Sequence, residues 1–177
     1  MKGSPFTLYF DQQERFTKAL RDYDPHLWYP PLRGGYEEDN PSNWFTCFVP
    51  DSWGHWKGAT YGVHFDFMYA RPRRFLPERI RLAVGVETPM LDSLRQSFKE
   101  DVISRVRQKG IAISGFALRA DARKKLLESD PIPLNDQSWH IALQRYITLQ
   151  PVVETIALVV REYYSDGAFD VPMVFPD

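Results

Sequence analysis

Apolar residues recur along the chain with two periods, and each period predicts one type of element. The clearest is a period of two over residues 61–69, where aromatic and β-branched side chains alternate with polar or small ones such as His64 and Asp66. This alternation is typical of a β-strand that turns one face to a core. A period of three to four residues predicts amphipathic helices over residues 9–23, over 88–110 and from residue 135 onward.

Shorter runs of β-branched and aromatic residues predict four more strands, at residues 44–49, 79–87, 111–118 and 126–129. The elements then follow in the order α-β-β-β-α-β-β-α. Helices gathered beside one antiparallel sheet define an α+β fold. The pattern therefore predicts an antiparallel sheet of about five strands packed against three helices.

Four residues set the expected ends of the helices. Thr88 and Pro89 form a typical helix start, with Thr88 as the cap and Pro89 in the first turn. Gly110 is expected to close that helix. Pro151 interrupts the last helical stripe and should kink or break the helix there, because proline offers no backbone N–H.

The length and composition narrow the class of protein. The chain has 177 residues, which predicts one domain spanning residues 1–177. The one cysteine, Cys47, excludes a disulfide framework. No apolar run approaches the ~20 residues that span a bilayer, and the first residues lack the apolar core of a signal peptide. We therefore expect a soluble, cytoplasmic domain without a membrane partner.

The net charge of −1 conceals a strong segregation of charge along the sequence. Residues 71–125 hold 14 Lys and Arg against 6 Asp and Glu, a balance of +8. The cationic residues include a dense group of five arginines, Arg71, Arg73, Arg74, Arg79 and Arg81. Arginine pairs bidentately with phosphate or carboxylate, which favours a binding surface for a partner. The alternative is that the acidic segments on either side neutralise these charges inside one fold.

Two tryptophans lie close together in a glycine-flanked connection between predicted strands. Trp53 and Trp56 are candidates to anchor a protein partner or to stack on a base. The alternative is that one of them folds back over the sheet.

Several segments resemble a known family of domains. They are the strand at Trp44, residues 62–65, residues 91–106, residues 119–125 and residues 136–139. In layout and in scattered residues they resemble an uncharacterised prokaryotic domain, often found at the C-terminal end of restriction-endonuclease-like proteins. The likeness covers residues 8–165 and carries over no catalytic or binding residue. It implies a prokaryotic or phage context and a role in nucleic-acid defence or its regulation.

The residues offer little local support for a catalytic or cofactor site. Asp66 and Glu87 lie on neighbouring predicted strands and could hold Mg²⁺ in a divergent nuclease, but no lysine stands two residues after Glu87. Asp66 is instead expected on a solvated strand face. The four histidines have no metal-ligand spacing, and no glycine-rich phosphate loop is present. Cys47 is expected to be a small buried hydrophobe. We expect no metal and no cofactor.

The sequence therefore favours a binding or regulatory protein without catalysis. The arginines and tryptophans named above would dock on nucleic acid or on an acidic protein partner. Self-association, in which the basic patch of one chain meets the acidic tail of another, is a further interpretation. The apolar residues of 166–177 are expected to dock on this domain or on a partner, because they cannot fold alone. The alternative function is a metal-dependent nuclease that uses Asp66 and Glu87.

Overall fold

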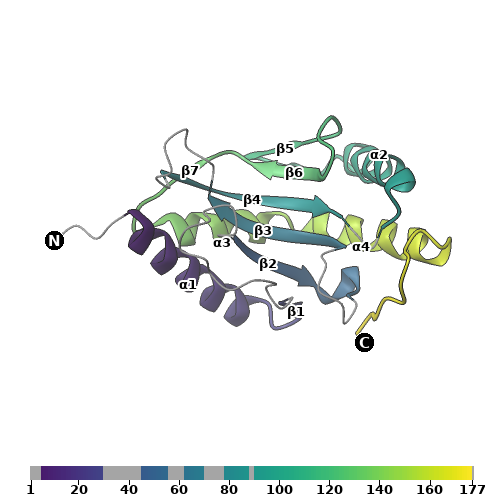
Figure 1. Ribbon diagram of the computed structural model, residues 1–177. Coiled ribbons are helices and arrows are strands. Elements are labelled where there is room, and N and C mark those ends of the chain that lie inside the picture. Colours follow the sequence, from purple (N-terminus) through teal and green to yellow (C-terminus); the bar gives the residue numbers. More distant parts are fainter. Residues whose placement is uncertain (1–4, 30–44, 56–61, 70–77, 88–89, 177) are drawn as a thin grey trace.

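An antiparallel sheet with helices on one of its faces forms the core of the computed structural model (Figure 1). The structure describes residues 5–29, 45–55, 62–69, 78–87 and 90–176. Within them the helices are α1 (Pro5–Tyr23), the short 3₁₀ helix η2 (Asp51–Trp53), α2 (Asp92–Gln108), α3 (Ser138–Thr148) and α4 (Gln150–Ser165). The strands are β1 (Leu27–Trp28), β2 (Phe45–Pro50), β3 (Val63–Tyr69), β4 (Arg79–Val86), β5 (Phe116–Leu118), β6 (Lys125–Ser129) and β7 (Ile132–Pro133).

The strands pair in the order β1-β2-β3-β4-β6-β5, and β7 also pairs with β4. All of these pairings are antiparallel. The α+β class predicted from the sequence is therefore correct. The sheet gains the two-residue strands β1 and β7, which are too short to show a period of their own.

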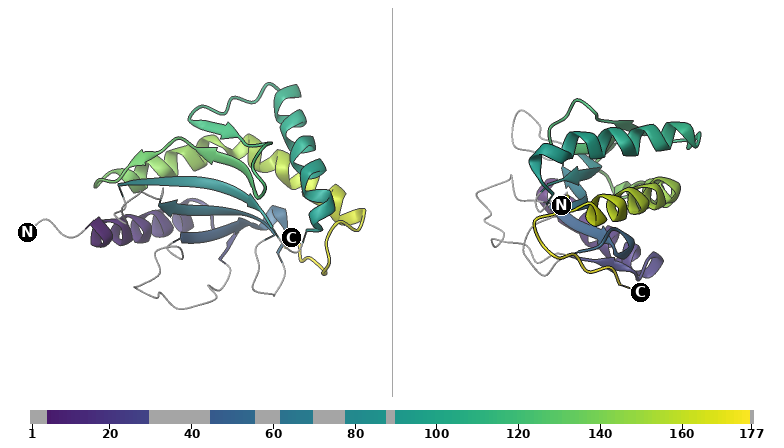
Figure 2. Two further views of the ribbon diagram at one scale, coloured as in Figure 1. Left: turned by 45° about the horizontal axis from the view of Figure 1, so that its top comes forward. Right: turned by 90° about the vertical axis from the view of Figure 1, so that its right-hand side faces the viewer.

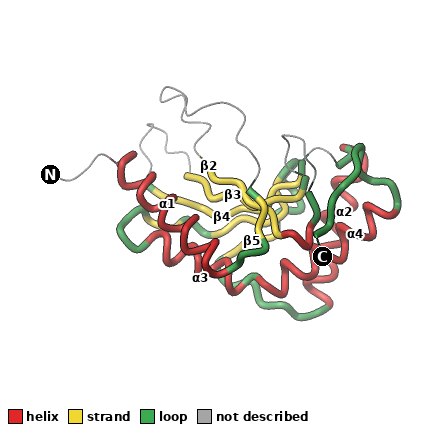
Figure 3. Tube along the Cα trace, turned by 90° about the horizontal axis from the view of Figure 1, so that it is seen from below, coloured by secondary structure: helices red, strands yellow, loops and turns green. Residues whose placement is uncertain are grey.

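One face of the sheet is covered by helices, as the two turned views show (Figures 2 and 3). Phe65 and Phe67 of β3 point to this side, where each is at most 1% exposed. Phe67 stacks on Phe16 of α1, and Phe65 meets Tyr146 of α3 edge to face. This buried aromatic layer confirms the strand period read from the sequence.

The start of α2 differs from the prediction. The helix begins at Asp92 rather than at Thr88, and residues 88 and 89 lie outside the described part of the chain. Met90 is 1% exposed and forms a β-bridge with Phe169, so this segment is extended just before the helix. Leu94, whose place in the apolar pattern of residues 88–110 predicts burial, is only half-buried. The end of α2 is as predicted: Gly110 has a φ of 63°, and the next residue donates back to Val106.

The last helical region consists of two helices, as Pro151 suggested. α3 ends at Thr148 and α4 begins at Gln150, with the proline in its first turn. At that position the missing N–H costs no helical hydrogen bond. The predicted strand 111–118 is shorter than expected and begins at Phe116, just after Gly115 with its φ of 77°.

The C-terminal segment docks on this domain, which was one of the two expectations for it. Ala168, Phe169 and Met173 are buried. Val174 forms a β-bridge with His55, close to η2. Among the described residues, no helix has both the length and the apolar character needed to cross a bilayer.

Candidate functional site

The face of β3 that points away from the helices carries polar side chains that are nevertheless buried. His64 is 3% exposed and Asp66 is 6% exposed. The expectation that Asp66 lies on a solvated strand face is therefore wrong. A period of two assigns side chains to faces, but it does not show whether the polar face is covered.

Antiparallel pairing adds residues from three other strands to this polar face. Cys47 of β2 lies opposite Asp66, and Gly85 of β4 lies opposite both His64 and Lys125 of β6. Lys125 Nζ donates to Asp66 Oδ2 at 2.9 Å, and His64 Nε2 lies 3.4 Å from the same oxygen. We call these four residues, Cys47, His64, Asp66 and Lys125, the polar-face cluster.

The imidazole of His64 is held in one orientation. Its Nδ1 lies 3.2 Å from the carbonyl oxygen of Gly62. Because a carbonyl only accepts, this nitrogen carries the proton and donates. The ring lies against Gly85, where an added Cβ would come within 2.6 Å of the ring atoms. Glycine at this position therefore makes room for the ring.

The surroundings of the cluster shift the pKa values of His64, Asp66 and Cys47. Burial alone would lower the pKa of His64, but the carboxylate of Asp66, with smaller contributions from Glu87 and the carbonyl of Gly62, raises it. Burial would also raise the pKa of Asp66, yet His64 and Lys125 together lower it. The pKa of the Cys47 thiol is raised well above its usual value, first by burial and then by the negative charge of Asp66. The thiol is therefore no activated nucleophile.

The cluster contains potential metal ligands. One donor atom each from Cys47, His64 and Asp66 lies within 4.8 Å of the other two. Asp66 Oδ1 is buried and has no hydrogen-bond partner within the described part of the chain. Sequence spacing could not reveal this group, because its members come from two strands and meet only through the register of the sheet.

The two acidic residues of the nuclease alternative each contact a lysine. Asp66 pairs with Lys125, and Glu87 Oε1 lies 3.6 Å from Lys124 Nζ. Both lysines are distant from Glu87 in sequence, because Lys125 is the first residue of β6 and Lys124 comes just before it. In the described residues, Glu87 does not join a group of three close metal-ligand side chains.

The predicted arginine patch is only partly within the described residues. Arg71, Arg73 and Arg74 lie outside them. Arg79 is exposed and has no ion-pair partner among the residues that the structure covers. Arg81 Nη1 instead lies 2.8 Å from Glu128 Oε1. Arg119 holds the other carboxylate oxygen of Glu128 at 3.0 Å. The alternative interpretation, in which acidic residues of the same chain neutralise the arginines, is therefore correct for Arg81.

Trp53 is a core residue rather than an exposed anchor. It is 1% exposed, stacks on Phe65 at 5.0 Å, and donates from Nε1 to the carbonyl of Val153 at 2.9 Å. The expectation of an exposed Trp53 is wrong, because the 3₁₀ helix η2 turns its indole against α4. The alternative, that one tryptophan folds back over the sheet, is correct for this residue. Trp56 lies outside the described residues.

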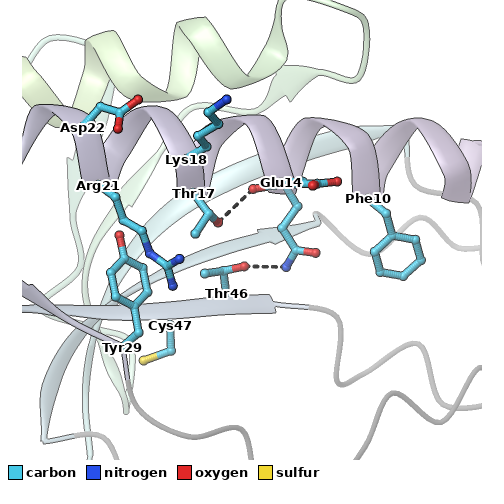
Figure 4. A pocket seen from close by; sticks show the side chains of 10 residues that line it. Phe10, Glu14, Thr17, Lys18, Arg21, Asp22, Tyr29, Thr46 and Cys47 are labelled. Carbon is cyan, nitrogen blue, oxygen red and sulfur yellow. Dashed lines mark hydrogen bonds between the residues drawn. The ribbon is translucent and has the colours of Figure 1, made fainter.

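A pocket of about 600 Å³ lies between α1 and the edge of β2 (Figure 4). Gln13 donates to Thr46 Oγ1 at 2.6 Å across it, and Arg21 lies over the ring of Tyr29. Its charged lining residues, two acidic and two basic, are Glu14, Lys18, Arg21 and Asp22. The two signs of charge are therefore balanced among the described residues that line the pocket. Cys47 also lines this pocket, and its sulfur points away from α1.

Comparison with protein-family models, curated proteins and solved structures finds no match to this chain. The resemblance to the prokaryotic domain described above stays a prediction.

Proposed function

We propose that the chain is a cytoplasmic binding or regulatory protein of a prokaryotic or phage defence-related system, which docks an arginine-rich segment on an acidic protein partner. In this proposal the docking segment is residues 71–81 and no catalysis is involved. The observation that carries it is the group of five arginines within a chain whose net charge is −1. The resemblance of residues 8–165 supports the defence context.

The exposure of Arg79 supports a partner for this segment. A cation that lacks an ion-pair partner among the described residues can pair with a carboxylate or phosphate of another molecule at little desolvation cost. Arg81, by contrast, is already paired with Glu128 and would support the patch rather than bind through it.

The overall charge favours a protein partner over nucleic acid. Nucleic-acid-binding domains usually have a basic isoelectric point, whereas that of this chain is about 6.4. Acidic residues also neutralise part of the basic middle segment, as Glu162 does for Arg105 at 2.9 Å. A local cationic segment on a neutral molecule suits an acidic protein surface, where complementarity sets the association rate.

The test is charge reversal with a matched control. The variant R71E/R73E/R74E and the control K18E/R107E/R123E change the net charge equally, and the control positions are exposed. Binding of a fluorescent poly-glutamate peptide and of a labelled DNA duplex is measured by anisotropy at several salt concentrations. We expect the affinity of the first variant for poly-glutamate to be at least about tenfold lower than that of the wild type, and the affinity of the control to equal that of the wild type. Melting temperatures should be nearly unchanged in both.

Three results would contradict the proposal. Tighter binding of the duplex than of the peptide, with an affinity that falls steeply with salt, would make the partner nucleic acid. An equal loss of affinity in both variants would mean that binding depends on the net charge of the protein and not on these three arginines. Unfolding of R71E/R73E/R74E would mean that these arginines pair inside the chain.

A metal-dependent nuclease is the second candidate, because Lys124 and Lys125 contact the two candidate acids Glu87 and Asp66. A nuclease of this type uses two carboxylates to hold Mg²⁺ and a lysine beside the attacking water. Cleavage of labelled DNA and RNA with Mg²⁺ or Mn²⁺ tests it. If the wild type cleaves and both D66A and E87A fold but do not cleave, the protein is a nuclease and the binding proposal is wrong.

A further inference from the structure

Three different kinds of metal ligand converge on the polar face of the sheet. Cys47 offers a sulfur, His64 a ring nitrogen and Asp66 a carboxylate oxygen, all within 4.8 Å of one another. Bonds of about 2.0–2.3 Å in a tetrahedral zinc site hold ligand atoms roughly 3.3–3.8 Å apart. Small movements of the side chains would therefore bring the three ligand atoms to the spacing of a site with one bound ion. The strand pairing already fixes their backbones, since Cys47 and Asp66 are direct partners in the β2–β3 register.

One carboxylate oxygen of Asp66 accepts a hydrogen bond, and the other has no donor among the described residues. Oδ2 accepts from Lys125 and faces His64, whereas Oδ1 is buried and lacks a hydrogen-bond partner among the described residues. A buried carboxylate oxygen without a donor is costly for the fold. A cation at the centre of the three ligands would bond to Oδ1 and remove this cost, while Lys125 continued to hold Oδ2.

The histidine is arranged as metal-binding histidines usually are. Its Nδ1 donates to the Gly62 carbonyl, and the same contact turns Nε2 toward Asp66. A metal-ligating histidine almost always donates its second nitrogen to a carbonyl or carboxylate, which fixes the ring and the tautomer. Gly85 leaves the space that the ring occupies. The orientation of this side chain is therefore set by the surrounding backbone.

The mixed ligand set selects the class of ion. Thiolate and imidazole suit borderline divalent transition metals, whereas Mg²⁺ and Ca²⁺ take oxygen ligands. We propose that Cys47, His64 and Asp66 bind a divalent transition-metal ion of the zinc class. Coordination releases the thiol proton to solvent, and with it the Nε2 proton of any His64 that is charged, because Nε2 binds a metal only when deprotonated. Three protein ligands leave a fourth position of a tetrahedral ion for water or another donor. This proposal is independent of the docking function, which concerns a different part of the chain.

The competing interpretation is an ion-pair cluster that serves only the fold. It accounts for the contacts of Lys125 and His64 with Asp66. It gives no role to the sulfur of Cys47 beside the carboxylate, and none to the unused Oδ1. The two interpretations differ in one property that can be measured directly, a bond between a metal and the sulfur.

Cobalt titration measures that bond. The chain has one cysteine, so a thiolate-to-cobalt charge-transfer band can come only from Cys47. Purified chain freed of metal with a chelator is titrated with Co²⁺ and then with Zn²⁺. We expect the band to saturate at one equivalent, tetrahedral d–d bands to appear with it, and Zn²⁺ to displace cobalt. Mg²⁺ should not compete.

Variants assign the ligands. C47A should lose the band, and both C47A and D66N should bind Zn²⁺ about 100-fold or more weakly, since even supporting residues around a metal typically contribute 10–100-fold. V49A removes a buried side chain from the same strand and should keep the wild-type affinity, as should H140Q at an exposed histidine. Circular dichroism checks the fold of each variant.

Results on the wild-type chain alone can overturn the proposal, so it does not depend on the variants folding. A folded wild-type chain without a charge-transfer band, or with a melting temperature that Zn²⁺ and Mg²⁺ raise equally, would contradict it. So would folded C47A and D66N variants that bind Zn²⁺ as tightly as V49A does. A zinc-specific, saturable rise in the melting temperature together with the band would support it.

Discussion

The two faces of the same sheet are built in opposite ways. On the helix side, Phe48 stacks on Phe65 with their rings 5.0 Å apart and 6° from parallel. The next residue along β3 is Asp66, which is also buried but pairs with Lys125 rather than with an apolar neighbour. One strand thus contributes alternately to an aromatic core and to the polar-face cluster.

The difference shows which face stabilises the fold. Burying an aromatic side chain contributes about 1.5–3 kcal/mol through removal of apolar surface from water. Burying charges costs several kcal/mol per ion, and pairing them repays this cost only when the geometry is very good. The helix face therefore supplies stability. The polar face carries groups that stability alone does not require, which is the pattern expected for a site.

The largest expected effect comes from the aromatic face. F65A should lower the free energy of unfolding by about 3–5 kcal/mol, because Phe65 is 1% exposed and the cavity left behind cannot collapse fully. Urea denaturation measures it, with L94A as the comparison. Leu94 is only half-buried, so its loss should be smaller. Equal costs for the two variants would contradict the assignment of the core.

A smaller effect is expected where the polar face is tightly packed. G85A places a methyl group 2.6 Å from the ring of His64 and should cost about 1–3 kcal/mol by overpacking. The same change in an H64A background should cost far less, since the ring is gone. A double-mutant cycle measures this coupling. If the cost were the same in both backgrounds, the ring would not occupy the space beside Gly85.

Tyr146, a member of the aromatic layer, contacts a charged side chain. Its hydroxyl donates to Asp24 Oδ2 at 2.9 Å. Burial, and next the charge of Asp24, raise the pKa of Tyr146 above its ordinary value of 10.0. The unfolded chain therefore loses this proton at lower pH than the folded chain, so the contribution of Tyr146 to stability is full below pH 10 and declines above it.

Y146F should cost about 1 kcal/mol at neutral pH and should show a weaker fall in melting temperature between pH 9 and 11 than the wild type. Thermal melts across this range measure both. An unchanged pH dependence would mean that Tyr146 has the same proton affinity in the folded and unfolded chain.

The smallest expected effect is the removal of the buried ion pair as a unit. D66V/K125M should leave the stability of the metal-free protein unchanged or raise it by about 1 kcal/mol, because a buried carboxylate and its partly buried ammonium partner disappear together. D66V alone should be less stable than the double variant, since it leaves the partly buried Lys125 without its carboxylate. A double variant as unstable as F65A would show that the polar face holds the fold together.

The sequence predicts the two faces of the sheet unequally well. The period of two in β3 placed Phe65 and Phe67 in the core, and Gly110 and Pro151 marked true helix ends. The same period placed Asp66 on the other face and could not show that the residue is buried. Cys47 and Lys125 are 19 and 59 residues away from Asp66 along the chain, and only the register of β2, β3, β4 and β6 brings them to it.

The most direct measurement is a crystal structure of the wild-type chain grown with Zn²⁺ and recorded across the zinc absorption edge. We expect one anomalous peak on the polar face, bonded to Cys47 Sγ, His64 Nε2 and Asp66 Oδ1 at about 2.0–2.3 Å. Gly62 and Lys125 should keep their contacts with His64 and Asp66. A zinc-soaked crystal with no peak there, and with Asp66 Oδ1 hydrogen-bonded to a protein donor, would contradict it.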